Sequence, residues 1–378
     1  MLDKIFLTRY EDVSTVLRSR RFGTSIRHVL SRDELGWPPP DPRQADFDRF
    51  EHNHLLSNEP PVHTRLRGLV GKAFTPKRVE NLRDRVTQIV DATLEELAAR
   101  ETFDLVHDFA EPLPVIVICE LLGVDAEHRA DLRAWSAAIV KLYEMEHTAE
   151  QQRAANDAVV AFSAFVRGIV AERRARPADD LITALVEVEE GGEMLTEDEL
   201  IGTCILLLNA GHEATVNGTS SAIITFMRQR AHWDAFVAAA EGGPSSAFIK
   251  TAVEELLRYD TPLPCFERWV LEDTELGGTT VERGAKLALL YASANRDPRK
   301  FDSPDALDLA RDPNPHVSFG LGIHFCLGAP LARLELQIAL PALARRFPGL
   351  HLVDEAAPLA YGAGFVIRGV TELNVRTR

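Results

Sequence analysis

The stretch "HVSFGLGIHFCLGAPLARLELQIAL", residues 316–340, contains one cysteine, Cys326, between three glycines and a helical pattern. Gly320 and Gly322 permit a tight turn with positive φ, and Gly328 lets the backbone pack against a flat object without a Cβ in the way. A proline follows in the first turn of the helix, where its missing N–H costs little. The cysteine therefore precedes a helix N-terminus, whose partial positive charge favours a thiolate over a thiol.

Several uses of such a cysteine are conceivable. A nucleophile needs a base, and His324 is a candidate, but H-x-C within one turn does not by itself create attack geometry. A zinc site needs a second pair of ligands, and no CxxC or HxxxH pair occurs elsewhere in the chain. If Cys326 were only a small buried apolar residue, the three glycines and Phe319 around it would have no explanation. Axial thiolate ligation of a haem iron accounts for all of them.

The segment "FGLGIHFCLG" resembles the F-G-x-G-x-H-x-C-x-G signature of the cytochrome P450 family residue by residue. Other motifs follow in the order of that family: "HTRLR", "NAGHEAT", "EELLR" and the irregular "NRDPRKFDSPDALDLARDPNPHVSFG". The resemblance runs from about Phe6 to the C-terminus and is closest to the soluble bacterial class. It implies that Glu255, Arg258 and Arg311 form a buried structural network.

The resemblance implies a mainly α fold with small β-sheets, arranged as a single domain over residues 1–378, with a long central helix crossing over the haem. Relatives usually carry some tens of residues before a segment like "RYEDV", so the chain is expected to be short at its N-terminus. Apolar recurrence at three- and four-residue steps independently predicts helices over 76–99, 108–121, 125–141, 148–175, 196–230, 244–260 and 328–347. Short strand patterns occupy 274–291 and 364–376.

The predicted central helix has its own start signal. Thr196 stands three residues before Glu199, which is a capping box opening an apolar run. At 1.5 Å per residue the helix would span ~50 Å, so it must cross the core. Its middle, "NAGHEATVNG", holds two glycines that each cost ~1 kcal/mol relative to alanine, which indicates close approach by another group.

Composition limits the setting of the protein. Of 378 residues, 46% are hydrophobic and 26% charged, as in ordinary soluble proteins, and the formal net charge is −15. That charge argues against general affinity for nucleic acid or an anionic membrane. The four cysteines form no CxxC pair, which favours reduced thiols. No apolar run was expected to approach the ~20 residues that cross a bilayer, so we expect a cytoplasmic protein.

The resemblance implies heme b (iron protoporphyrin IX) as cofactor, with Cys326 as the iron ligand and Phe319 and Gly328 beside it. It also implies that the haem propionates are held by His63, Arg67, Arg268 and His324. The interval 60–78 contains five Lys/Arg and no acid, a local anomaly in an acidic chain. The remaining positive charges of this basic segment, Arg65, Lys72, Lys77 and Arg78, could form a rim on which an acidic electron donor docks.

Within "NAGHEAT", the resemblance implies that Ala210 and Gly211 open a groove for O2 and that Glu213 gates protons. The family typically has a threonine directly after the acid, whereas this chain has Ala214 there and Thr215 one place later. Successive helical residues are turned by ~100°, so Thr215 faces a different direction from Ala214. The neighbouring histidine, His212, is expected to pack or to form hydrogen bonds.

The implied activity is insertion of one oxygen atom from O2 into an apolar small molecule, by hydroxylation or epoxidation, with electrons from a ferredoxin and its reductase. Two alternatives remain. A peroxygenase of the same fold characteristically has Arg-Pro where this chain has Glu213-Ala214, and a non-catalytic haem sensor or binding protein finds support only in the missing alcohol. The sequence does not identify the substrate, whose contacts are expected from residues 43–56, Leu207, Leu208, 262–266 and 364–366.

Overall fold

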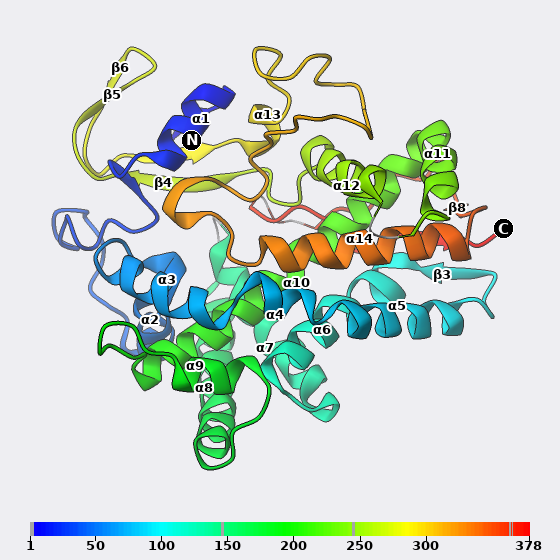
Figure 1. The fold of residues 1–378 in the computed structure, drawn as a ribbon. Coiled ribbons are helices and arrows are strands. Elements are labelled where there is room, and N and C mark those ends of the chain that lie inside the picture. The colour runs from blue at the N-terminus through cyan, green and yellow to red at the C-terminus, as the bar shows by residue number, and fades with distance from the viewer. Residues whose placement is uncertain (1–3, 145–146, 244–245, 363, 365) are drawn as a thin grey trace.

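The computed structural model describes residues 4–144, 147–243, 246–362, 364 and 366–378 (Figure 1). Phe365, in one expected substrate segment, lies outside the described residues. The α-helices are α1 (Tyr10–Arg18), α2 (Ala45–His52), α3 (Val62–Ala73), α4 (Pro76–Glu80), α5 (Arg83–Leu97), α6 (Pro112–Leu122), α7 (Arg129–Val140), α8 (Ala149–Ala175), α9 (Leu181–Glu187), α10 (Glu197–Arg228), α11 (Arg230–Ala240), α12 (Ala247–Tyr259), α13 (Tyr291–Ala294) and α14 (Ala329–Arg346). Short helical turns are η1 (Pro42–Gln44), η2 (Leu55–Ser57), the π-helical η3 (Leu105–Ala110), η4 (Ala126–His128), η5 (Lys141–Tyr143) and η6 (Gly322–His324).

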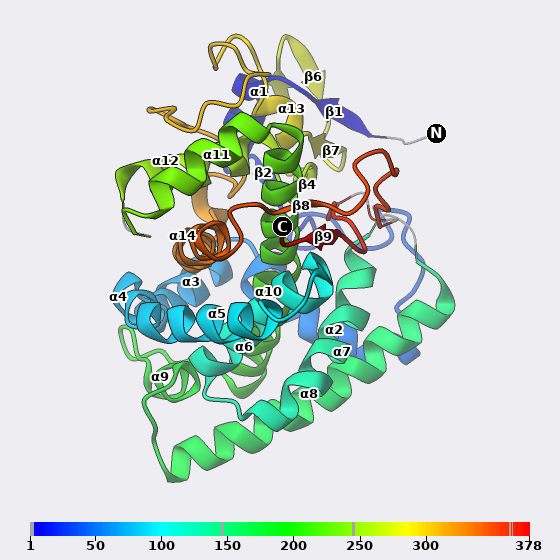
Figure 2. The same cartoon turned by 90° about the vertical axis from the view of Figure 1, so that its right-hand side faces the viewer.

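The strands form three small sheets. They are β1 (Ile5–Leu7), β2 (Phe22–Gly23), β3 (Thr102–Asp104), β4 (Phe266–Val270), β5 (Thr274–Leu276), β6 (Thr279–Val281), β7 (Lys286–Leu289), β8 (His351–Leu352) and β9 (Asn374–Arg376). The largest sheet has the order β1-β7-β4-β2, in which β1 runs parallel to β7 and the other pairs are antiparallel. This sheet lies with α1 and α13 at one end of the molecule, opposite α8 (Figure 2). The mainly α class with small sheets is therefore confirmed.

Most predicted helices are present, with corrected ends. The helix predicted over 76–99 is two helices, because α4 ends at Glu80 and α5 begins at Arg83. The helix predicted over 108–121 begins in the π-helical η3 and continues as α6, which starts at Pro112, a residue suited to a first helical turn. The short strands expected within 274–291 and 364–376 are present as β5, β6 and β7 and as β9.

The central helix α10 begins as the sequence predicts. The Glu199 N–H donates to Thr196 Oγ1 at 3.3 Å, and the Thr196 N–H donates to Glu199 Oε2 at 2.9 Å, which completes the capping box. The helix has 32 residues and contacts helices α6, α8, α12 and α14. It passes through the middle of the molecule, with α14 on one side and α8 on the other (Figures 1 and 2).

Two apolar clusters hold the elements in place. The larger one gathers helices α5, α6, α8, α10, α12 and α14, and the smaller one joins α1 to the largest sheet through residues such as Val13, Val16 and Leu287. Three of the four cysteines, Cys119, Cys204 and Cys265, are buried free thiols, as predicted. Burial raises their pKa values to about 11, about 12 and about 11, so they stay protonated and behave as small apolar residues.

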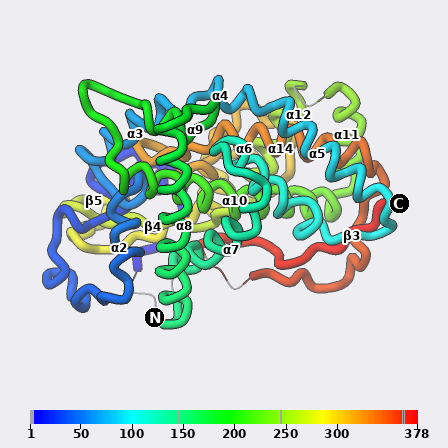
Figure 3. The backbone as a smooth tube through the Cα atoms, turned by 90° about the horizontal axis from the view of Figure 1, so that it is seen from below, coloured from blue at the N-terminus to red at the C-terminus, as the bar shows by residue number. Residues whose placement is uncertain are grey.

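Helix α8 corrects one expectation about membranes. Among the described residues it is the one helix long and apolar enough to cross a bilayer by length and composition, so the expectation that no apolar segment approaches that length was too strict. It packs against α2, α7, α9 and α10, and with α9 it lies across the side seen in Figure 3. Packed helices of soluble proteins pass the same test, so this finding is weak evidence for a membrane.

Candidate active site

The loop before α14 has the backbone geometry that its glycines predict. Gly320 and Gly322 have φ of +66° and +72°. A Cβ placed on Gly322 would lie 2.2 Å from the Leu17 carbonyl oxygen, so only glycine fits where the loop rests on the end of α1. The Cys326 N–H donates to the Phe319 carbonyl at 2.9 Å, which closes the turn. These contacts fix the backbone position of Cys326, and with it the point from which its side chain begins.

Cys326 is exposed, unlike the other three cysteines. The backbone N–H groups of Gly328 and Ala329 and the charges of Arg67 and Arg333 all favour the thiolate. Burial acts against them and is the larger effect, so the pKa of the thiol is raised. The two N–H groups at the start of α14 thus act in the direction expected from the sequence, although burial opposes them.

Imidazole and guanidinium side chains gather beside this loop. The rings of His63 and His324 lie 4.3 Å apart, although they come from α3 and from the turn η6. Burial and the charges of His324 and Arg67 lower the pKa of His63 to about 4, against the opposing charge of Glu59. Three of the four predicted propionate ligands therefore share one neighbourhood that is rich in hydrogen-bond donors.

Arg268 approaches the loop from the largest sheet. It is buried, lies over the Phe266 ring at 5.1 Å and donates to the Glu267 carbonyl at 2.8 Å. Its charge acts on Tyr291, and a Cβ on Gly320 would lie 3.6 Å from the Tyr291 hydroxyl. The fourth predicted propionate ligand thus borders the same loop on the side of β4.

Glu59 belongs to this site and was missed by the sequence analysis. Its Oε1 accepts hydrogen bonds from the Thr24 N–H at 2.5 Å and the Thr24 hydroxyl at 3.0 Å, and it lies 3.1 Å from His324 Nε2. Because of these contacts, the pKa of its carboxyl is lowered despite burial. The basic segment 60–78 contains no acid, and Glu59, the residue directly before it, lies just outside that pattern.

These residues fit an iron porphyrin. The thiol of Cys326 is accessible, and a Cβ on Gly328 would lie only 3.9 Å from its sulfur. Phe319 is half-buried and holds the guanidinium of Arg333 over its ring at 4.4 Å. Cationic side chains that could pair with two carboxylates lie on α3, η6 and β4 around the same loop.

The middle of α10 turns one open face away from the core. Leu207, Gly211 and Ala214 are half-buried and Ala210 is exposed, whereas Thr215 is only 5% exposed. A Cβ on Gly211 would have no atom within 4 Å. The helix is regular through residues 210–215, so Thr215 faces the protein interior, as expected from the helical turn. No hydroxyl of α10 replaces the missing alcohol at Ala214.

Glu213 is half-buried and has an acidic neighbour, Glu111. Burial and the nearby charge of Glu111 raise the pKa of Glu213. The Glu111 carboxylate lies 2.9 Å from His107 Nδ1 and 3.4 Å from an Arg133 guanidinium nitrogen, and these two side chains are 60% and 52% exposed. Glu111, His107 and Arg133 thus form a polar cluster near Glu213, and the sequence analysis did not single out these three residues.

His212 is packed, as expected, but without the hydrogen bonds that were its other expected role. It is 2% exposed, and its Nδ1 lies 3.9 Å from Glu213 Oε1. Within the described part of the chain neither ring nitrogen has a hydrogen-bond partner. Burial lowers the pKa of His212, so the ring is neutral at ordinary pH.

The predicted network of Glu255, Arg258 and Arg311 is confirmed. Arg258 donates to both carboxylate oxygens of Glu255, at 2.7 and 2.8 Å, and both side chains are completely buried. Arg311 donates to Glu255 Oε2 at 3.1 Å. Arg258 also donates to the Asn295 and Pro304 carbonyls, each at 2.8 Å, and so ties α12 to the irregular stretch before the ligand loop.

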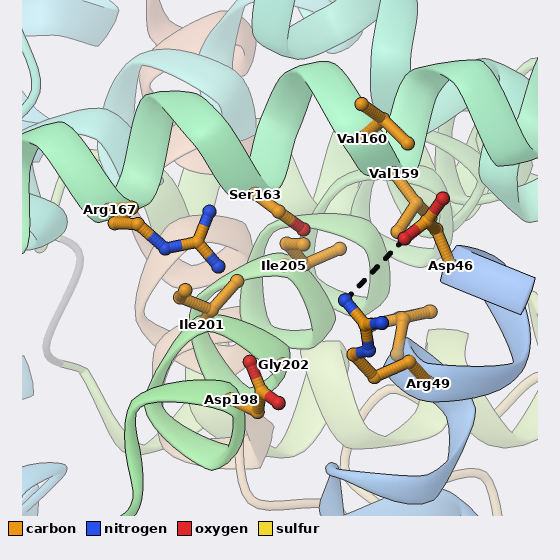
Figure 4. A pocket seen from close by; sticks show the side chains of 11 residues that line it. Asp46, Arg49, Val159, Val160, Ser163, Arg167, Asp198, Ile201, Gly202 and Ile205 are labelled. Atoms are coloured by element: carbon orange, nitrogen blue, oxygen red, sulfur yellow. Dashed lines mark ion pairs between the residues drawn. The ribbon is translucent and has the colours of Figure 1, made fainter.

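A separate small pocket of about 100 Å³ lies between α2, α8 and α10 (Figure 4). Asp46 and Arg49 of α2 form an ion pair at 3.5 Å on one side of it, and Arg167 and Ser163 of α8 face it from another. None of the predicted haem or oxygen residues lines this pocket. Asp46, Arg49 and Phe50, however, belong to the segment 43–56 from which substrate contacts are expected, so that segment lines this pocket in part.

Comparison with known proteins agrees with this geometry. The profile of the family described as Cytochrome P450 matches residues 24–236 and 246–360. The polyketide biosynthesis cytochrome P450 PksS of Bacillus subtilis is 38% identical over 371 residues, covering 98% of this chain and 88% of the relative. This chain belongs to the cytochrome P450 family, whose members bind haem b through a thiolate, and it is a P450 monooxygenase.

Other relatives extend the comparison. The 6-deoxyerythronolide B hydroxylase of Saccharopolyspora erythraea is 36% identical, covering 99% of this chain and 90% of the relative. The crystal structure of P450BioI in complex with an acyl carrier protein ligated to hexadec-9Z-enoic acid has a TM-score of 0.88 and 33% identity, and it covers 98% of this chain and 91% of that one. The fold predicted from the sequence is thus confirmed.

Proposed function

We propose that this monooxygenase takes electrons from a ferredoxin and its reductase and inserts one oxygen atom into an apolar organic small molecule, by hydroxylation or epoxidation. The observation that carries the proposal is the accessible Cys326 just before α14, with the hydrogen-bond donors His63, Arg67 and His324 grouped beside its loop. When bound, the haem supplies the activation of O2 and the oxygen transfer itself.

In this proposal the proximal residues bind and orient. Cys326 ligates iron, and His63, Arg67, Arg268 and His324 hold the two propionates. Glu59 orients His324, because its carboxylate lies within hydrogen-bond distance of the His324 Nε2 and leaves the other ring nitrogen for a second contact. The low pKa of His63 favours its neutral form, so it would act as a hydrogen-bond donor and not as a full charge.

The distal residues would admit O2 and deliver protons. Ala210 and Gly211 leave space on the open face of α10, and Glu213 is the group from which protons enter. A proton relay must lie within hydrogen-bond reach or one water away, and Ala214 offers no hydroxyl. Ordered water, or a hydroxyl of the substrate, fills that position in our proposal.

No specific observation favours either of the two alternative functions. A peroxygenase would be expected to have an arginine and a proline at residues 213 and 214, where this chain has glutamate and alanine. A sensor or binding protein rests only on the missing alcohol, and the raised pKa of Glu213, which keeps its proton to higher pH than an ordinary glutamate does, suits proton delivery instead.

The experiment combines a binding screen with turnover. Apolar ligands that shift the haem spectrum are incubated with the holoenzyme, a ferredoxin, its reductase and isotopically labelled O2. We expect one labelled oxygen atom in each product molecule. Product formed equally well with hydrogen peroxide alone would support the peroxygenase, and reduction of the haem without product from any bound ligand would contradict the proposal.

A further inference from the structure

A short acidic hairpin, residues 188–195, connects α9 to the start of α10. Glu190 and Glu193 exchange two backbone hydrogen bonds, at 2.9 and 3.1 Å, and the residues between them, Gly191 and Gly192, have φ of +62° and +87°. Two consecutive positive φ values define a type I′ turn, which glycine adopts without strain. The acidic hairpin therefore has a defined shape.

This hairpin lies against the basic face of α3. Lys72 Nζ is 3.4 Å from Glu190 Oε1 and 3.4 Å from the Glu189 carbonyl oxygen. Arg65 Nε is 3.5 Å from Glu193 Oε2. Arg65 also pairs with Glu199 in the first turn of α10. With Arg78, which lies 3.8 Å from Asp179, three of the four charges expected to form a docking rim are thus paired within the protein, two of them with the hairpin.

Gly68 provides the space for this contact. It lies between Arg65 and Lys72 on one face of α3, at helical steps of three and four residues. A Cβ on Gly68 would be 2.3 Å from Glu190 Oε2, so any larger residue would displace that carboxylate. The helix surface is therefore shaped for the hairpin as well as charged for it.

The contact is weak enough to be displaced. Lys72 and Glu190 are 50% and 48% exposed, and Glu193 is 60% exposed. Exposed ion pairs contribute little stability, and salt screens them. Another acidic surface with more charges could take the place of the hairpin.

We propose that the acidic hairpin is an intramolecular competitor for the surface on which an acidic electron donor docks. The proposal rests on the ferredoxin partner of the proposed function. Helix α3 carries both the paired charges and the candidate propionate ligands His63 and Arg67, so a donor seated on it would lie next to the cofactor site. The hairpin then lowers the association rate of every donor and favours those whose acidic surface can displace it.

The test compares two variants of the haem-loaded full chain that carry the same change in net charge. The first neutralises the hairpin and the second neutralises exposed acids elsewhere: Glu189→Gln/Glu190→Gln/Glu193→Gln against Glu96→Gln/Glu241→Gln/Glu355→Gln. The probe is an acidic [2Fe–2S] ferredoxin, and the readout is the second-order rate of haem reduction. We expect the hairpin variant to exceed the control by on the order of threefold to tenfold at low salt, with the difference shrinking at high salt.

A charge-neutral variant and a labelling measurement complete the test. Gly68→Ala should displace Glu190 and raise the reduction rate in the same direction. Acylation of Lys72, relative to that of Lys77 in the same basic segment, should rise in both hairpin-releasing variants. Equal rates in the hairpin variant and its control, with Lys72 labelling increased, would overturn the competitor role alone. Failure of the ferredoxin to reduce wild type and all variants would contradict the electron donor of the proposed function.

Discussion

The loop that carries Cys326 and the middle of α10 are both parts of the proposed site, but their residues are constrained in different ways. In the loop, particular residue types are required, because Gly320 and Gly322 adopt positive φ and Cys326 presents its thiol. In the helix, Gly211 and Ala214 matter because these small residues leave space beside the helix. The loop can therefore be recognised from sequence alone, whereas the helix needs a structure before its open face is visible.

The largest effect is expected behind the loop, at the network that braces it. Glu255→Gln should lower the free energy of unfolding by about 3–5 kcal/mol, because it leaves the completely buried Arg258 without its counter-charge. Chemical denaturation of the holoenzyme measures this. As a matched control, Glu95→Gln removes the exposed pair with Arg346 and should cost less than about 1 kcal/mol. Similar losses of unfolding free energy in the two variants would show that the buried Glu255–Arg258 pair stabilises the fold no more than an exposed ion pair does.

On the distal side the effect should be on rate. Glu213→Gln should slow steady-state turnover on the order of tenfold to a hundredfold, because an amide cannot deliver a proton. Its unfolding midpoint should change little, since the side chain is 33% exposed and pairs only loosely with His212. Turnover equal to that of wild type would remove Glu213 from the proton route.

The pH dependence of turnover tests the same residue. The pKa of Glu213 is raised, so its neutral, proton-donating form persists to higher pH than in an ordinary glutamate. Turnover of wild type should therefore fall as pH increases through this raised pKa, and Glu213→Gln should lose that limb of the profile. An unchanged limb in the variant would assign the titration to another group.

The smallest effect is expected at Thr215. Its side chain is buried in the protein beside a regular helical turn, so Thr215→Ala should leave the product formed per electron consumed nearly unchanged. Coupling is measured as product against NAD(P)H oxidised, with hydrogen peroxide as the by-product. Severe uncoupling would mean that α10 unwinds locally when substrate binds and that Thr215 is the working alcohol.

The sequence predicted those features that depend on local backbone chemistry. The capping box at Thr196, the turn at Gly320 and the Glu255–Arg258 pair are each set by residues a few positions apart, and all are present. The break between α4 and α5 shows the limit, because tertiary packing decides where a weak pattern stops.

Contacts between distant segments could not be predicted in this way. Glu59 and His324 are 265 positions apart, and the pairs between α3 and the acidic hairpin join residues more than a hundred positions apart. Residues 60–78 contain no acid, so the sequence gives no sign that the basic side chains of this segment are paired. The raised pKa of the Cys326 thiol depends on burial, which no local pattern reports.

The central claim is that Cys326 binds the haem iron as a thiolate. The most direct measurement is the absorption spectrum of the ferrous carbon monoxide complex of wild type and of Cys326→Ser. We expect the thiolate-type Soret band in wild type and its loss in the variant, because an alcohol is a far poorer donor to iron than a thiolate. A wild-type spectrum retained by Cys326→Ser would show that another group binds iron and would contradict the account of this site.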